Sequence, residues 1–362
     1  MRIGMVCPYS LSVPGGVQGQ VLGLARALRG RGESVRVLAP CDGPPPEPFV
    51  TPLGNCVPLG ANGSVAPIAP DPAAQLRTIR ALRDEDFDVV HLHEPFAPGP
   101  TMTAMLVKSA PLVATFHSAG SSFAYDIFKP LTRRAAPRLD ICFAVSDDAE
   151  TLAKASLGGV YERAFNAVEV SRFRSRRPHK TQGPTILFVA RHEERKGLAV
   201  LLEAFSSMDV DADLWIAGVG PESASLQARF AGDPRISWLG ELDEDEKIER
   251  MLGADVFCAP SLHGESFGIV LLEAMAAETA VVASDLPGYA KVTRHGRDAV
   301  LVPPAEPSLL AEALSRVLRD RSRRDELVAS GTDRVAEFSM RRLADLYLDA
   351  YRRAIDGWVQ PH

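Results

Sequence analysis

The segment ADVFCAPSLHGESFGIVLLEAMAAETAVVAS, residues 254–284, contains the unit on which the predicted fold is built. It begins with the apolar run ADVFCAP (254–260) and ends with a second run, TAVVAS (279–284). Neither run alternates with polar residues, which is typical of strands buried on both faces of a parallel sheet. The residues between them predict a helix that starts at about Ser266. A strand, a helix and a second strand predict a right-handed crossover, and hence a parallel sheet covered by helices.

The same alternation of strand-like runs and helical stretches extends through the whole chain. The runs in the first half are RIGMVC (2–7), SVRVLAP (34–40), FDVVHLH (87–93), APLVATFH (110–117) and LDICFAV (139–145). The other runs in the second half are TILFVA (185–190), DLWIAG (213–218), RISWLG (235–240) and DAVLVP (298–303). Because 362 residues exceed one ordinary core, the sequence predicts an α/β protein of two doubly wound, Rossmann-like domains.

The polar, basic stretch SRFRSRRPHKTQGP (171–184) is the predicted linker between these domains. The first domain is then expected at 1–170 and the second at 185–338. A last helical segment, 339–362, is expected to pack back on the first domain. Two such domains would face a central cleft lined by the carboxyl ends of their strands, where open α/β folds bind ligands.

The charge, the cysteines and the apolar runs limit which partners and which compartment are expected for the protein. The net charge of −6 does not favour a general nucleic-acid binder. The five cysteines are odd in number and lack metal-ligand spacing, which favours a reducing, cytoplasmic compartment. No apolar run approaches the ~20 residues that span a bilayer, so any contact with a membrane is expected to be peripheral.

Two features of the first half point to the expected cleft. The loop at Pro14, Gly15 and Gly16 ends where a helix begins, so free backbone N–H groups could bind an anion there; a simple turn is the alternative. The absence of a G-x-G-x-x-G pattern argues against a nicotinamide-dependent oxidoreductase. His117 follows the fourth strand, at the edge where catalytic groups gather, although a histidine in such a place is more often structural than catalytic.

The second half contains a cluster of cations and a pair of carboxylates. In VARHEERKG (189–197), Arg191, Arg195 and Lys196 follow a buried strand, which suits a diphosphate; a solvated charged turn is the alternative. GVGPE (218–222) is a second glycine-rich strand exit. Glu265 and Glu273 lie eight residues apart, so both carboxylates are expected on one helix face, with Glu265 at the helix cap.

Together these motifs resemble the retaining glycosyltransferases of family 4, which have the two-domain GT-B fold. The segments VPGGVQ, FDVVHLHEP, VATFH, RKG, GESFGIVLLEAMA and AVVASDLPGY carry the resemblance along nearly the whole chain. Within that family they are most similar to the actinobacterial enzymes that add the first mannose to phosphatidyl-myo-inositol. The segment NGSVA departs from them, because it continues as PIAPDP without an arginine for the lipid phosphate.

The resemblance implies GDP-mannose as the donor and assigns a role to each matching residue. Gly16, Arg191 and Lys196 would hold the diphosphate; Leu242 and Lys247 would lie near the base, and Glu273 near the ribose. Glu265 and the backbone of Phe267 and Gly268 would hold the mannose, with His117 beside it. Tyr9, Gln18 and Asn62 would contact the inositol phosphate.

The implied chemistry is transfer with retention by front-side attack, in which Arg191 and Lys196 stabilise the leaving diphosphate. No metal cofactor is required for this, and stimulation by Mg²⁺ stays open. Two alternatives also stay open. One is a family 4 enzyme with another nucleotide sugar or another acceptor. The other is a sugar-nucleotide-binding protein or epimerase that transfers nothing.

Two basic stretches of the first half suit an anionic lipid surface on the inner face of the plasma membrane. LRTIRALR (76–83) contributes Arg77, Arg80 and Arg83 at helical spacing, and IFKPLTRRAAPR (127–138) contributes Lys129, Arg133 and Arg134. An ordinary solvated helix face is the alternative for each.

Overall fold

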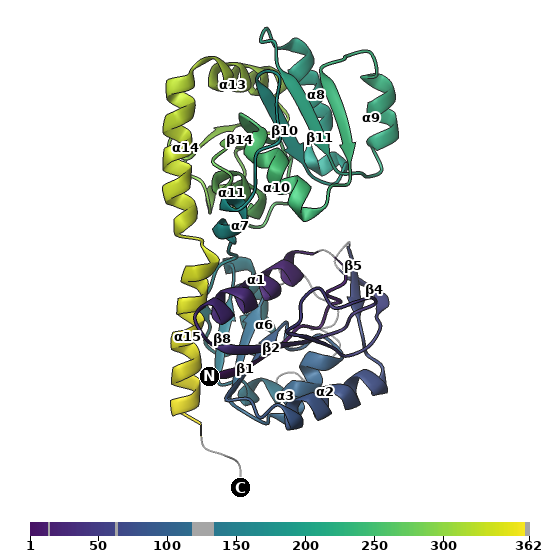
Figure 1. Cartoon of the computed structure of the whole chain (residues 1–362), viewed down its shortest axis with the longest axis vertical. Coiled ribbons are helices and arrows are strands. Elements are labelled where there is room, and N and C mark those ends of the chain that lie inside the picture. Colours follow the sequence, from purple (N-terminus) through teal and green to yellow (C-terminus); the bar gives the residue numbers. More distant parts are fainter. Residues whose placement is uncertain (14, 62–63, 118–133, 359–362) are drawn as a thin grey trace. The chain divides into compact units, whose positions relative to one another are not determined.

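The computed structural model describes residues 1–13, 15–61, 64–117 and 134–358. The chain forms two compact units (Figure 1). Unit 1 comprises Met1–Ala167 together with Met340–His362, and unit 2 comprises Val168–Ser339. None of the helices in the described ranges combines the length and the hydropathy needed to span a bilayer.

Unit 1 is built on a parallel sheet with the strand order β3-β2-β1-β6-β7-β8-β9. Its strands are β1 (Arg2–Val6), β2 (Ser34–Ala39), β3 (Val50–Pro52), β6 (Val89–His93), β7 (Leu112–Phe116), β8 (Ile141–Ala144) and β9 (Glu162–Arg163). A separate antiparallel pair is formed by β4 (Val57–Ala61) and β5 (Ser64–Ile68). The helices are α1 (Gly16–Gly30), α2 (Pro72–Asp84), α3 (Pro100–Val107), α6 (Asp147–Leu157), α15 (Met340–Asp356) and the 3-10 turn η1 (Ala136–Arg138).

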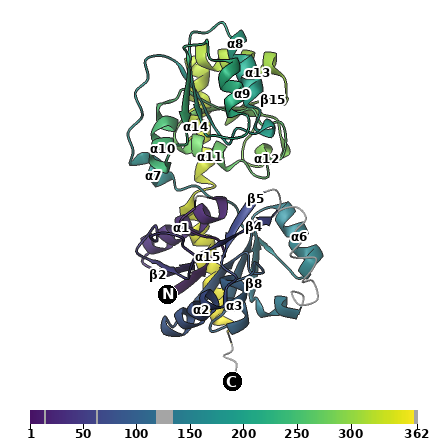
Figure 2. The ribbon, with the colours of Figure 1, turned by 90° about the vertical axis from the view of Figure 1, so that its right-hand side faces the viewer.

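Unit 2 repeats the design with the strand order β12-β11-β10-β13-β14-β15, again parallel. Its strands are β10 (Thr185–Val189), β11 (Asp213–Ala217), β12 (Ile236–Gly240), β13 (Val256–Ala259), β14 (Ala280–Ser284) and β15 (Ala299–Val302). The helices are α7 (Val170–Arg174), α8 (Leu198–Ser207), α9 (Ser223–Arg229), α10 (Glu244–Gly253), α11 (Ile269–Ala276), α12 (Pro287–Ala290), α13 (Pro307–Arg319), α14 (Arg321–Ala336) and the 3-10 turn η2 (Glu194–Lys196). Within each unit, helices lie on both sides of the sheet (Figure 2).

These two sheets confirm the predicted α/β class, and each run predicted as a strand contains one. Side-chain caps start several of the helices between them. Asp71 accepts a hydrogen bond from the amide of Ala74 at the start of α2, and Ser146 accepts one from Ala149 at the start of α6. Strand burial therefore accounts for the strands, and cap residues fix the start of some of the helices between them.

The division of the chain differs in detail from the prediction. The segment 171–184 was expected to link the domains, but it belongs to unit 2, because α7 packs against α10 and α11. The chain passes from unit 1 to unit 2 between Ala167 and Val168. The final helix, α15, is part of unit 1, where it contacts α1, β6 and β7.

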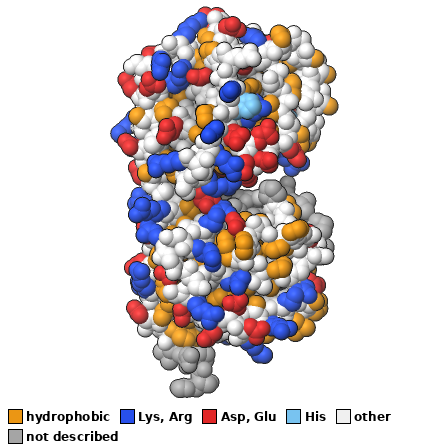
Figure 3. Space-filling view, viewed as in Figure 1, with side chains coloured by type: hydrophobic (Ala, Val, Ile, Leu, Met, Phe, Trp, Pro, Cys, Tyr) orange, Lys and Arg blue, Asp and Glu red, His pale blue; other side chains and the backbone are white. Residues whose placement is uncertain are grey.

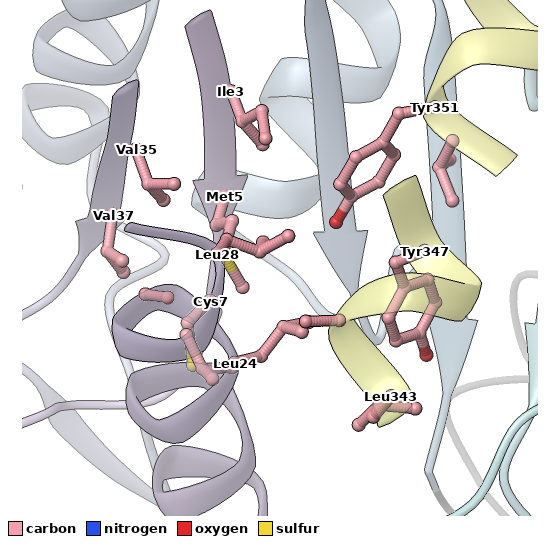
Figure 4. Packing of buried hydrophobic residues seen from close by; sticks show 14 of the residues in the cluster. Ile3, Met5, Cys7, Leu24, Leu28, Val35, Val37, Leu343, Tyr347 and Tyr351 are labelled. Carbon is pink, nitrogen blue, oxygen red and sulfur yellow. The ribbon is translucent and has the colours of Figure 1, made fainter. Parts of the chain in front are cut away.

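Side chains from β1, β2, α1 and α15 converge in the core of unit 1 (Figure 4). Two tyrosines of α15 carry hydroxyl groups into this core. The Tyr351 hydroxyl lies 2.7 Å from Nδ1 of His91, and Nε2 of the same ring lies 2.8 Å from Oγ1 of Thr115. Thr115 is in turn 2.7 Å from the Tyr347 hydroxyl. The last helix is therefore joined to β6 and β7 by a buried hydrogen-bonded chain as well as by apolar packing.

Burial lowers the pKa of His91 to about 3, so this ring is neutral in the folded protein at neutral pH. In the unfolded chain the same ring has an ordinary pKa of about 6.5. Between about pH 3 and pH 6.5, the unfolded chain therefore binds one proton more at this ring than the folded protein does. The stability that depends on neutral His91 is therefore complete above about pH 6.5 and is lost as the pH falls toward 3.

We predict that His91→Gln reduces the pH dependence of the free energy of unfolding. Near pH 5 the slope should be shallower than in the wild type by about 1.4 kcal/mol per pH unit, the value for one proton. Denaturant titrations followed by circular dichroism at pH 7, 6 and 5 measure it. His263→Gln, at an exposed histidine, is the matched control and should keep the wild-type slope. Equal slopes for the two variants would contradict the assignment.

Candidate active site

The exits of β10 and β13 meet at the carboxyl edge of the unit 2 sheet, where these two strands are neighbours. The amide of Leu262, beyond β13, donates a 2.8 Å hydrogen bond to the carbonyl of Arg195, beyond β10. Gly197 has φ +69°, and a Cβ there would lie 2.0 Å from the Pro260 carbonyl oxygen. Only glycine lets the two loops approach so closely.

This approach brings Lys196 and Glu265 into contact. Nζ of Lys196 lies 2.5 Å from Oε1 of Glu265, and the two side chains are only 20% and 12% exposed. Nη1 of Arg195 is 3.9 Å from the same oxygen, and the hydroxyl of Ser261 donates to it at 2.9 Å. All three partners therefore converge on Oε1, at the junction of two strand exits.

The loop that carries Glu265 differs from the prediction. The helix was expected to start at about Ser266 with Glu265 at its cap, but α11 begins at Ile269 after Gly268, whose φ of +86° interrupts the helix. Glu265 thus lies in the preceding loop, and the expectation that Glu265 and Glu273 share one helix face is wrong. The side chain of Phe267 is buried against Phe338, with ring centroids 5.8 Å apart.

Glu273 lies within α11 and forms a second lysine–carboxylate pair. Its Oε1 is 3.1 Å from Nζ of Lys247, which is also 3.0 Å from Glu244. Burial alone would lower the pKa of Lys247, but the two carboxylates raise it above its usual value. The Lys247 ammonium is therefore charged at neutral pH, and it lies between the Glu244 and Glu273 side chains. Leu242, half-buried, lies just beyond the end of β12.

Arg191 lies at another part of this edge. It is 65% exposed, and its Nη1 is 3.1 Å from Glu193. It lines an open hollow of about 580 Å³ with Glu241 and residues 218–221. Gly218 has φ +113°, and a Cβ there would lie 2.0 Å from the Ala190 carbonyl oxygen, so this exit also requires glycine. Arg195 rather than Arg191 is thus the arginine beside Glu265.

Of the residues predicted in unit 1, His117 lies directly after β7. Its Nε2 is 3.0 Å from Nδ1 of His93, and its amide donates to Oε1 of Glu94 at 2.7 Å. Burial lowers the pKa of His117 to about 4, although a hydrogen bond to Asn166 opposes the shift. At neutral pH the imidazole is therefore uncharged, and its position is fixed by its neighbours.

Other predicted residues lie at the start of α1 and in the segment before it. Gly16 is the first residue of α1, and a Cβ added there would meet nothing within 4 Å. Gln18 is buried, with its Nε2 3.4 Å from the Ser10 carbonyl oxygen. Tyr9 is half-buried and forms an isolated bridge with Ile68. Asn62, predicted to contact the acceptor, lies outside the described residues.

The basic residues predicted for a membrane surface have different surroundings. Arg77 donates from Nε to the Leu53 carbonyl at 2.5 Å, and Arg80 is 84% exposed and 3.3 Å from Asp84. Arg83 and Arg134 are exposed; Lys129 and Arg133 lie outside the described residues. Basic and hydrophobic side chains lie next to one another on the lower part of unit 1, where α2 runs (Figure 3).

The sequence patterns did not identify Ser261 or Tyr289, which join the Glu265 cluster. The Tyr289 hydroxyl lies 3.0 Å from Oγ of Ser261. Ser261 was marked only by its position directly after β13. Tyr289 was marked only as the last residue of the segment AVVASDLPGY, which gave it no role. Within the described part of the chain, no group of three or more His, Cys, Asp and Glu side chains could hold a metal ion.

Solved structures with little sequence identity have the same fold. A glycosyltransferase from Rickettsia africae aligns with a TM-score of 0.74 at 17% identity, covering 99% of both chains. The Anabaena protein HepE, solved in complex with UDP and glucose, aligns with a TM-score of 0.71 at 16% identity, covering 98% of this chain and all of that one. These similarities show the two-sheet GT-B fold.

The sequence comparisons identify the family. The model described as glycosyltransferase family 4 matches residues 14–163, and the one described as glycosyl transferases group 1 matches residues 170–334. A Mycobacterium leprae protein named phosphatidyl-myo-inositol mannosyltransferase is 42% identical, covering 97% of this chain and 96% of its own. A protein of the same name from Propionibacterium freudenreichii is 35% identical, covering 81% and 79%. The chain therefore belongs to glycosyltransferase family 4, and it is a glycosyltransferase.

Proposed function

We propose that the protein transfers a mannosyl residue from GDP-mannose to phosphatidyl-myo-inositol, with retention of configuration, at the cytoplasmic face of the plasma membrane. The names of relatives that are 35–42% identical support the sugar and the acceptor. The observation that carries the proposal is the contact between Lys196 and Glu265 at the meeting of two strand exits. This contact supports the proposal because it brings a cation and a carboxylate together at the strand ends, where open α/β folds bind ligands.

The reaction breaks the bond between C1 of mannose and an oxygen of the β-phosphate, and forms one between C1 and an inositol oxygen. The proton of the inositol hydroxyl passes to the leaving phosphate on the same face, which retains the configuration. Negative charge grows on the diphosphate as the bond breaks, so a fixed cation lowers the barrier. An ammonium has three N–H donors, and Lys196 can therefore contact the phosphate while keeping Glu265.

The remaining predicted residues fit defined parts of this substrate. Arg191 and the backbone at Gly16 suit the diphosphate, and Lys247, Glu273 and Leu242 suit the nucleoside. Glu265, with the backbone of Phe267 and Gly268, suits the mannose. Because His117 is neutral at neutral pH, its ring adds no charge beside the oxocarbenium-like carbon. Lys196 and Arg191 supply the positive charge, so the proposed reaction requires no metal, and Mg²⁺ would only stimulate it.

A lipid acceptor requires unit 1 to reach a membrane surface. On α2, Leu76 is 68% exposed and lies on the same helix as the exposed cations Arg80 and Arg83. Exposed apolar and basic side chains on one helix favour adsorption to anionic lipid, at about 1 kcal/mol for each cation near the surface. The proposed attachment is therefore peripheral.

We predict that Glu265→Gln and Lys196→Met each lower kcat/KM for GDP-mannose by about 10²–10³-fold, the loss typical of removing one stabilising group from a transition state. Both substitutions preserve side-chain size while removing the charge. Steady-state kinetics with vesicles of phosphatidylinositol measure the effect. Lys180→Met, at an exposed lysine of the same unit, is the control and should match the wild type. Wild-type activity in both site variants would contradict the assignment of the site.

The acceptor is tested by incubating the wild type with radiolabelled GDP-mannose and vesicles that contain phosphatidylinositol. We predict that label appears in a lipid that releases mannosyl-inositol phosphate on deacylation and phosphodiester cleavage. Vesicles of phosphatidylglycerol provide the same charge without inositol and should stay unlabelled. If label instead enters a water-soluble product, or only with another nucleotide sugar, the proposed acceptor or donor is wrong.

A further inference from the structure

A buried tyrosine reaches the Glu265 cluster from the element that follows β14. Tyr289 lies in α12 and is only 1% exposed. Its hydroxyl is 3.0 Å from Oγ of Ser261, which is itself 2% exposed and contacts Oε1 of Glu265 at 2.9 Å. The chain of contacts therefore runs from the interior of unit 2 to the carboxylate.

The direction of the two hydrogen bonds follows from the chemistry of the groups. An ionised carboxylate accepts hydrogen bonds and has none to donate. Ser261 has a single hydroxyl proton, so donating it to Glu265 leaves its oxygen to accept from the Tyr289 hydroxyl. Ser261 therefore donates to Glu265, and the Tyr289 hydroxyl is hydrogen-bonded both to Ser261 and to Glu265 itself.

The same short helix also fixes the backbone of the loop. A Cβ at Gly288 would lie 1.9 Å from the Glu265 carbonyl oxygen, so α12 packs directly on the main chain of that residue. A Cβ at Gly268 would lie 2.8 Å from the ring of Tyr289. Both glycines are required by this approach, and the loop is held at Glu265 and again at Gly268.

We propose that Ser261 and Tyr289 are positioning residues that orient the Glu265 carboxylate toward the sugar of the nucleotide sugar. Ser261 holds Oε1, and Tyr289 holds both Ser261 and the carboxylate, so that Oε2 can accept hydrogen bonds from sugar hydroxyls. This inference rests on the proposed function of Glu265 and adds the residues that act through it.

The arrangement also explains why two different donors converge on one oxygen. Lys196 contacts Oε1 at 2.5 Å and is the residue proposed to meet the leaving diphosphate. While the ammonium contacts both the phosphate and Glu265, Ser261 keeps the carboxylate in place. The diphosphate and the sugar can then be bound together without the loss of either interaction.

The test compares GDP with GDP-mannose in the variants Ser261→Ala and Tyr289→Phe. A positioning role predicts that affinity for GDP, measured by calorimetry, stays within about twofold of the wild type, because the diphosphate contacts are intact. The gain in affinity of GDP-mannose over GDP should fall about tenfold, and so should kcat/KM for GDP-mannose. This is the effect expected for one well-placed hydrogen bond to a charged group. Ser261→Thr keeps the hydroxyl and should recover most of the loss.

The matched control is Ser330→Ala, which removes another hydroxyl that donates to a carboxylate of unit 2, Asp298, at 2.7 Å. It should leave both affinities and the kinetics unchanged. Parallel losses of GDP and GDP-mannose affinity in Ser261→Ala and Tyr289→Phe would overturn the proposal in favour of a general structural role. Unchanged kinetics in both variants would overturn it as well.

Whether GDP-mannose is the donor is tested separately, with the wild-type protein. If the wild type binds another nucleotide sugar in preference to GDP-mannose, the proposed function is wrong. The same comparison is then made between that nucleotide sugar and its own nucleoside diphosphate. A selective loss for the sugar-bearing ligand supports the positioning role, and a parallel loss contradicts it.

Discussion

The ion pair between Lys196 and Glu265 is the interaction on which the candidate site depends. It exists because β10 and β13 are neighbours in a parallel sheet, so their carboxyl ends open at the same edge. Gly197 and Gly288 then allow the surrounding backbone segments to approach within distances that any Cβ would prevent. A partly buried pair gains little net stability, because desolvation offsets the attraction. We propose that the pair instead holds two charges ready for a ligand.

The sequence predicted the strands and helices of the fold more completely than it predicted the contacts of the candidate site. Buried parallel strands are continuous apolar runs, so the eleven predicted runs each contain a strand. The short edge strands β3 and β9 gave no such signal, because few of their residues are buried. The β4–β5 pair also lies outside the predicted runs. The predicted start of α11 is three residues too early. The pattern of apolar residues does not show that Gly268 has a positive φ, which delays the helix to Ile269.

Within the site, sequence reasoning selected the right segments but not every contact. Lys196 and Glu265 were both predicted, and they meet. Arg191 was expected with them, yet Arg195 lies nearer the carboxylate, since the conformation of a loop decides which neighbouring side chain faces inward. Tyr289 was missed because its role depends on α12 packing on a loop that precedes it by more than twenty residues. Such contacts arise from tertiary packing alone.

The most direct measurement is a crystal structure of the protein with intact GDP-mannose. The account predicts that Nζ of Lys196 lies within hydrogen-bond distance of the β-phosphate, roughly 2.7–3.2 Å, while a mannose hydroxyl donates to Oε2 of Glu265. Oε1 should still be bound by Ser261. A structure in which the diphosphate lies away from Lys196, or in which the sugar makes no contact with Glu265, would contradict the account.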